Sequence, residues 1–105
     1  MANFVLLYKG GGELPATPEA QQTAMEAWGV WFGSIGAGVV DSGNPFGPSA
    51  SIAANGASTN GTNSGYTGYS VIAADDLASA VAKSKSCPIL VNGGSVDVFE
   101  TFNIM

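Results

Sequence analysis

Short apolar runs and helical repeats alternate along this chain. Residues 4–8 are apolar throughout, a pattern typical of a strand that is covered on both faces. Thr17-Pro18-Glu19 has the residue types that begin a helix, and apolar residues then recur at helical spacing up to the glycines at 36 and 38. The pattern therefore predicts a strand over residues 4–8, followed by a helix over residues 18–35.

The middle of the chain predicts short strands separated by loops. Residues 39–42 form a short second strand, and the Gly- and Pro-rich residues 43–48 form a loop. Residues 50–54 either continue that strand or make a separate one. The Gly, Ser, Thr and Asn residues of 55–65 predict a connection, and because strands flank it, a long hairpin is one form that it could take.

The last third of the chain predicts a strand, a helix and a final strand. Residues 66–73 form the first strand, and Asp75 or Asp76 caps the helix that Pro88 ends. Residues 95–102 form the last strand. The expected inner side of the helix consists of Leu77, Ala78, Val81 and Ala82.

The predicted order is β-α-β-β-α-β, the ferredoxin-like α+β plan, in a single domain over residues 1–105. Two helices cover one face of a four-stranded sheet, yet the strand over residues 4–8 is apolar on both faces. We therefore expect a homodimer in which the uncovered face meets a second copy.

Composition and charge narrow the possible partners. Hydrophobic residues make up 46% of the chain and charged residues only 10%, with a net charge of −5 and no arginine. Nucleic acids and anionic membrane surfaces require clustered Lys and Arg, so we expect neither partner. No basic stretch followed by a long apolar one opens the sequence, and we expect a cytoplasmic protein.

The chemistry available to one chain is limited. The sequence contains no histidine and one cysteine, Cys87, which excludes a Ser-His-Asp or Cys-His mechanism within the chain and argues against a metal site or other cofactor. Cys87 lies at the end of the predicted helix, immediately before Pro88, where we expect a buried, inert thiol.

The candidate ligand-binding residues are carboxylates, aromatic rings and strand-end polar groups. Glu26 offers a base on the first helix, and Asp41, Ser42 and Asn44 follow the second strand, where binding residues often lie. A solvated carboxylate and ordinary turn chemistry are the respective alternatives. The remaining candidates, with solvated or core positions as alternatives, are Tyr8, Lys9, Trp28 and Tyr69.

Several segments together resemble the DGPF-type branch of the YCII-related family, over nearly the whole chain. In order, they are Met25-Glu26-Ala27-Trp28, residues 38–43, Phe46-Gly47-Pro48, residues 68–72, Cys87-Pro88 and residues 93–98. The resemblance implies a dimeric α/β barrel built from ferredoxin-like subunits.

The chain departs from that family at the positions where chemistry is expected. Residues 59–64 stand where the Asp-Gly-Pro-Phe motif belongs, and Cys87 stands where the family has an aspartate before the proline. The His/Asp pair associated with the founding branch has no histidine here, so its chemistry does not carry over.

Three functions fit these observations. The first is a protein that binds a small molecule in a pocket between the sheet and helices of a homodimer. The second is a cofactor-free enzyme, of the lyase or monooxygenase-like kind, that uses a carboxylate or a tyrosine. The third is a regulatory or structural dimer with no ligand. An apolar pocket without an acid of raised pKa favours the first, and a pocket with such an acid favours the second.

Overall fold

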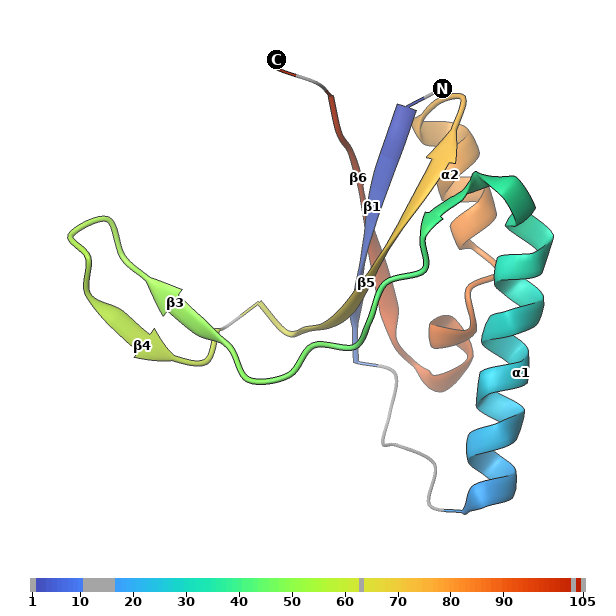
Figure 1. Ribbon diagram of the computed structural model, residues 1–105, viewed down its shortest axis with the longest axis horizontal. Helices are drawn as coiled ribbons and strands as arrows, with labels where there is room; N and C mark the ends of the chain where they lie inside the picture. Colours follow the sequence, from blue (N-terminus) through green and yellow to red (C-terminus); the bar gives the residue numbers. More distant parts are fainter. Residues whose placement is uncertain (1, 11–16, 63, 103, 105) are drawn as a thin grey trace.

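A computed structural model describes residues 2–10, 17–62, 64–102 and 104. It is an α+β structure in which two helices lie on one face of a four-stranded antiparallel sheet (Figure 1). The sheet order is β2-β5-β1-β6. These strands are β1 (Ala2–Lys9), β2 (Val39–Asp41), β5 (Tyr66–Ala74) and β6 (Ser95–Glu100). The predicted β-α-β-β-α-β order is confirmed for this sheet, and the arrangement is compatible with the ferredoxin-like plan.

Both helices begin at the predicted caps. Helix α1 (Pro18–Ile35) follows Thr17, whose hydroxyl accepts a hydrogen bond from the Ala20 amide at 3.1 Å. Helix α2 (Leu77–Ser84) follows Asp76, whose carboxylate accepts one from the Ser79 amide at 2.8 Å. The Asp76 carboxyl therefore has a lowered pKa, chiefly because of this hydrogen bond.

Two predictions about the second helix are wrong. Pro88 does not end it, because α2 stops at Ser84 and Pro88 instead begins the short 3₁₀ helix η2 (Pro88–Asn92). A second short 3₁₀ helix, η1 (Gly36–Gly38), follows α1. The buried residues of α2 are Ala80 and Ser84, whereas the four residues expected on its inner side are exposed. The helix is buried through these small side chains, and its larger residues, Leu77 and Val81, remain partly exposed.

The core lies between the helices and one face of the sheet. Phe4, Leu6 and Tyr8 alternate along β1 on the buried face, and their partners on β5 are Ile72, Ser70 and Gly68. Paired residues of antiparallel strands share a face. Trp31 of α1 packs on this layer, and its indole nitrogen donates to the Lys83 carbonyl oxygen at 3.0 Å, which joins the two helices.

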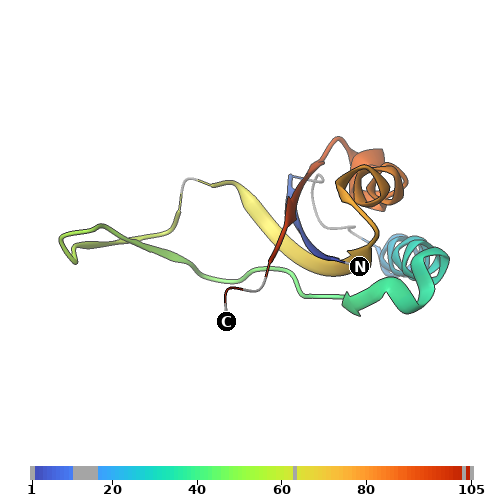
Figure 2. The same ribbon diagram turned by 90° about the horizontal axis from the view of Figure 1, so that it is seen from above.

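No helix of the described residues lies over the other face of the sheet (Figure 2). Val5 pairs with Val71 on one side and with Phe99 on the other, which places an apolar row across this face. Val5 and Val71 are half-buried, and Phe99 is 50% exposed. We call this surface the open face. Strand β6 ends at Glu100, so the predicted extension to Phe102 is wrong.

The segment between β2 and β5 forms a separate hairpin. Strand β3 (Ala50–Ile52) pairs with β4 (Ser58–Asn60) in a two-stranded sheet of their own. Of the alternatives for residues 50–54, the separate strand is confirmed. The connection predicted over residues 55–65 contains β4, so β3 pairs with β4 rather than with β5, and the expected long hairpin is wrong. The hairpin extends from the body on the side away from the helices (Figures 1 and 2).

Candidate functional site

The eight predicted site residues do not converge on one place. Tyr8 and Trp28 lie on the helix-covered side of the sheet, and the Ser42 carbonyl joins them there through Ser70. The residues associated with the open face are Lys9, Asp41 and Tyr69, whose contacts are described below. Glu26 lies apart from both groups, and Asn44 contacts Tyr69 through its backbone carbonyl.

Tyr8 belongs to a buried chain of hydroxyl groups. Its hydroxyl donates to Ser70 Oγ at 2.7 Å, and Ser70 Oγ donates to the Ser42 carbonyl oxygen at 2.6 Å. The rings of Trp28 and Tyr8 pack nearly perpendicular to each other, with 5.2 Å between centroids. Burial raises the pKa of Tyr8 well above its usual value, against the opposing effect of the Ser70 hydrogen bond. These hydrogen bonds link β1, β5 and the end of β2, so the hydroxyl groups fit a structural role.

Cys87 lies against the same group. Its side chain is 1% exposed, and burial raises the pKa of the thiol to about 11. A thiol with a raised pKa is protonated near neutral pH and is a poor nucleophile. The predicted burial of this cysteine is confirmed.

Lys9 takes part in a polar cluster on the open face. Its ammonium nitrogen lies 3.2 Å from Asp97 Oδ2 and 4.9 Å from the centre of the Tyr66 ring. The Tyr66 hydroxyl donates to the same carboxylate oxygen at 2.8 Å. The Tyr66 hydrogen bond, followed by Lys9, lowers the pKa of Asp97, and the bond to Asp97 raises the pKa of Tyr66.

Sequence reasoning missed Tyr66 and Asp97 as members of this cluster. They lie 31 residues apart and meet only because β5 and β6 both flank β1. The register could have found them, since Lys9 pairs with Tyr66 and Leu7 pairs with Asp97. Without that register, the sequence identifies Asp97 only as a polar residue in a strand of alternating apolar and polar positions.

Two of the predicted site residues, Asp41 and Tyr69, are in contact with each other. The Tyr69 hydroxyl donates to Asp41 Oδ2 at 3.2 Å, and the Gly43 amide donates to Asp41 Oδ1 at 2.8 Å. Phe46 stacks on the Tyr69 ring, with centroids 5.8 Å apart and planes 15° apart. The bond to Gly43 is turn chemistry, the alternative that the sequence left open for Asp41.

Glu26 and Asn44 have ordinary surroundings. Glu26 is exposed on α1, and its carboxylate accepts a hydrogen bond from the Gln22 side-chain amide at 3.2 Å. Asn44 is also exposed, and its backbone carbonyl accepts from the Tyr69 amide at 3.3 Å. Glu26 is therefore the solvated carboxylate that the sequence left as the alternative to a base in a binding site.

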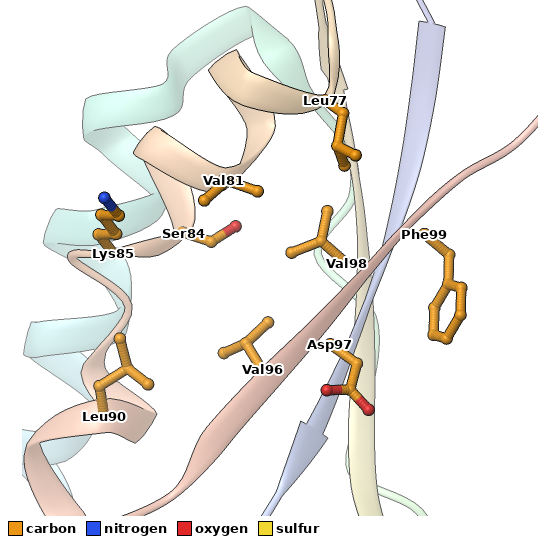
Figure 3. Close-up of a pocket in the computed structure, with 9 residues that line it drawn as sticks. All are labelled: Leu77, Val81, Ser84, Lys85, Leu90, Val96, Asp97, Val98 and Phe99. Carbon is orange, nitrogen blue, oxygen red and sulfur yellow. The ribbon is translucent and has the colours of Figure 1, made fainter.

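Two open apolar grooves lie elsewhere. The first, of about 470 Å³, separates α2 and η2 from β6, and we call it the sheet–helix groove (Figure 3). Figure 3 shows Val96 and Val98 extending toward the α2 side, whereas Phe99 points to the other side of the strand. Its residues are Leu77, Val81, Ser84, Lys85, Leu90, Val96, Asp97, Val98 and Phe99. Lys85 and Ser84 are the polar groups on its helical side.

The second groove, of about 480 Å³, lies between α1 and the segment around η2. It is lined by Ala27, Val30, Trp31, Ser34, Ser86, Pro88 and Val91. None of the eight predicted residues is among the described residues that line either groove. The carboxyl groups whose pKa the surroundings shift, those of Asp76 and Asp97, have it lowered rather than raised.

Comparison with known proteins adds no assignment. Neither protein-family models nor curated proteins give a match to this chain. The resemblance to the YCII-related family therefore stays a prediction. Within the described residues, no group of three or more Cys, Asp or Glu side chains is placed to hold a metal ion. No helix there has the length and apolar character needed to cross a membrane.

Proposed function

We propose that this protein is a homodimer that binds a small, largely apolar molecule in the sheet–helix groove. The observation that carries the dimer is the apolar row of Val71, Val5 and Phe99, on the sheet face that no helix in the described part of the chain covers. An antiparallel sheet commonly exposes one face, but that face is then mainly polar. An apolar face of this kind is stabilised by contact with another molecule.

The charged groups on the open face are compatible with burial in a dimer. Lys9 and Asp97 already neutralise each other, and Tyr66 donates to the same carboxylate. Asp41 also has two hydrogen-bond donors within its own chain. Burying paired and hydrogen-bonded charges costs far less than burying isolated ones. A two-fold axis through this face would bring the same apolar row together from both copies.

Sedimentation equilibrium tests the dimer directly. We expect the wild-type chain to be a dimer at micromolar concentration and Phe99→Asp to be a monomer with an unchanged far-UV spectrum. Val30→Asp, which adds the same charge at an exposed position of α1, should remain dimeric. A monomeric wild-type chain at tens of micromolar would refute the dimer.

The groove supports binding more than catalysis. Its helical side is formed by Leu77, Val81 and Leu90, and the strand contributes Val96 and Val98. The Ser84 hydroxyl donates to the Ala80 carbonyl oxygen at 2.8 Å, so it is engaged within α2. Lys85 adds a positive charge at one end of α2, which suits an apolar molecule with one anionic group.

An anionic apolar dye, anilinonaphthalene sulfonate, provides the first test of the groove. We expect the wild-type protein to bind the dye with increased fluorescence and to gain thermal stability as the dye concentration rises. Val81→Glu places a carboxylate in the groove and should weaken dye binding, whereas Ala82→Glu on the same helix should not. Equal dye binding by both variants would contradict the site, and a dimer that binds no metabolite in a thermal-shift screen would favour the regulatory or structural role.

A further inference from the structure

The hairpin of residues 49–61, which we call the arm, is more exposed than the sheet and helices of the body. Every residue from 44 to 60 is exposed, and Ile52, its one large aliphatic residue, is 76% exposed. The radius of gyration is 15.3 Å, against about 13 Å for a compact chain of this length. Figures 1 and 2 both show the arm extending from the body on the side away from the helices.

The arm is nonetheless formed by regular hydrogen bonds. Ala53 donates to the Ala57 carbonyl at 2.7 Å, and the Asn55 side chain accepts from the Ala57 amide at 2.9 Å, which closes the turn around Gly56. At the other end, Gly61 donates to the Ser49 carbonyl at 2.7 Å. A two-stranded hairpin without further support is only marginally stable in water. The arm therefore needs a surface to pack on.

The base of the arm is fixed to the body. The Phe46 amide donates to the Thr67 carbonyl at 2.8 Å, and Pro45 forms a bridge with Gly68 of β5. A Cβ atom at Gly43 would overlap the carbonyl oxygen of Tyr69, so the chain passes against β5 at this point. These contacts hold the start of the arm against β5, so its projection on the side of the open face is part of the fold.

We propose that the arm of each copy packs against the body of the second copy in the dimer, so that the two arms hold the two open faces together. This inference rests on the proposed dimer. A second copy seated on the open face would lie on the side to which the arm projects. The arm thereby extends the interface from the apolar row of Val71, Val5 and Phe99 to residues that the single chain leaves exposed.

The chemistry of the arm suits a protein surface rather than other partners. Residues 42–74 contain no Asp, Glu, Lys or Arg, so burying the arm leaves no charge without water. Phosphate backbones need basic residues, and a bilayer surface needs several large apolar ones. Small side chains and the free edges of β3 and β4 permit close approach and backbone hydrogen bonding to another chain.

Two arm variants test this contact. Ile52→Asp adds a charge to the arm, and its matched control is Met25→Asp on α1, where the native side chain is 74% exposed. In the second variant, Asn-Gly replaces residues 50–60, because the hydrogen-bonded pair of Ser49 and Gly61 can be closed by a two-residue turn. We expect both arm variants to raise the dimer dissociation constant at least about tenfold, with Met25→Asp unchanged.

Hydrogen exchange on the wild-type chain tests independently whether the arm packs in the dimer. The amides of β3 and β4 should exchange slowly at concentrations where the dimer forms and rapidly after dilution to the monomer. A wild-type dimer whose dissociation constant is the same in both arm variants would overturn the role of the arm while leaving the dimer in place. A wild-type monomer would overturn both, and far-UV spectra of the variants would show that the body still folds.

Discussion

Replacing Ser70 by Ala should destabilise the protein more than replacing Tyr8 by Phe. Both residues belong to the buried hydroxyl chain in which Tyr8 donates to Ser70 and Ser70 donates to the Ser42 carbonyl. The two changes remove different parts of it. The comparison also separates a structural role for Tyr8 from the ligand-binding role that the sequence suggested.

The magnitudes follow from which groups lose their partners. Tyr8→Phe removes one hydrogen bond and leaves Ser70 bonded to Ser42, a loss of about 0.5–1.5 kcal/mol. Ser70→Ala removes two hydrogen bonds and deprives the hydroxyl of Tyr8, a residue that is only 6% exposed, of its acceptor. A buried donor without an acceptor costs about 1–3 kcal/mol, so we expect Ser70→Ala to lower the free energy of unfolding by about 2–4 kcal/mol in total. The adjacent thiol of Cys87 is a weak acceptor and replaces little of this.

Urea unfolding at one fixed protein concentration measures these differences, because association would otherwise shift the apparent stability. The double variant should lose less than the sum of the single variants by about 1 kcal/mol, since Tyr8→Phe removes the unpaired hydroxyl. Ser86→Ala, at an exposed serine that donates to a carbonyl within its own segment, serves as the control and should change stability by less than about 0.5 kcal/mol. A Ser70→Ala variant as stable as Tyr8→Phe would refute the buried hydroxyl groups of Tyr8 and Ser70 as a structural unit. Strict additivity of the two changes would refute it as well.

Two other predictions concern the backbone of the fold and its pH dependence. Gly29→Ala and Gly33→Ala should each stabilise the protein by about 1 kcal/mol in urea unfolding, because a Cβ there meets nothing within 4 Å, whereas Gly43→Ala should destabilise it. Above pH 9 the unfolded thiol of Cys87 ionises while the folded thiol, with a pKa of about 11, stays protonated, so stability that is complete below pH 9 falls between pH 9 and 11. Cys87→Ala should flatten that decline in pH-dependent urea unfolding, and an unchanged slope would contradict the assignment.

The local signals in the sequence were sufficient to predict most of the helices and strands. Thr17-Pro18-Glu19 and Asp76 begin the two helices because their side chains or ring geometry satisfy the first turn, which is a matter of a few neighbouring residues. The end of α2 was missed because Pro88 also suits the first turn of a new helix, and here it begins η2. Which role a proline plays depends on the chain around it.

Gly29 and Gly33 of α1 show the limit of spacing as a signal. Two glycines one helical turn apart predict close approach of a neighbouring element, yet both positions are open within the described chain. Spacing on a helix gives the face on which residues lie but does not say whether another element covers that face. The glycines therefore remain as a local cost in α1.

The candidate site shows where local signals end. Tyr8, Lys9 and Tyr69 were each identified by residue type, but the chemistry of each is set by a partner from a distant strand: Ser70, Asp97 and Asp41, respectively. The sheet–helix groove lies between α2 and β6, on a helix whose buried residues are the small Ala80 and Ser84. No periodicity in one segment contains that information.

The low charge of the chain has a specific distribution, and this distribution links the open face to the arm. Asp41 and Asp75 bound a stretch without any charged residue, and that stretch contains both the arm and strand β5, which contributes Tyr69 and Val71 to the open face. Charged residues are normally the cheapest way to keep an exposed segment in water, and they are depleted where proteins meet. In a single chain, a fully exposed arm without charges serves no packing purpose. In a dimer through the open face, the same stretch supplies both the sheet surface and the segment that covers its edge, which gives one physical reason for the absence of charge in both.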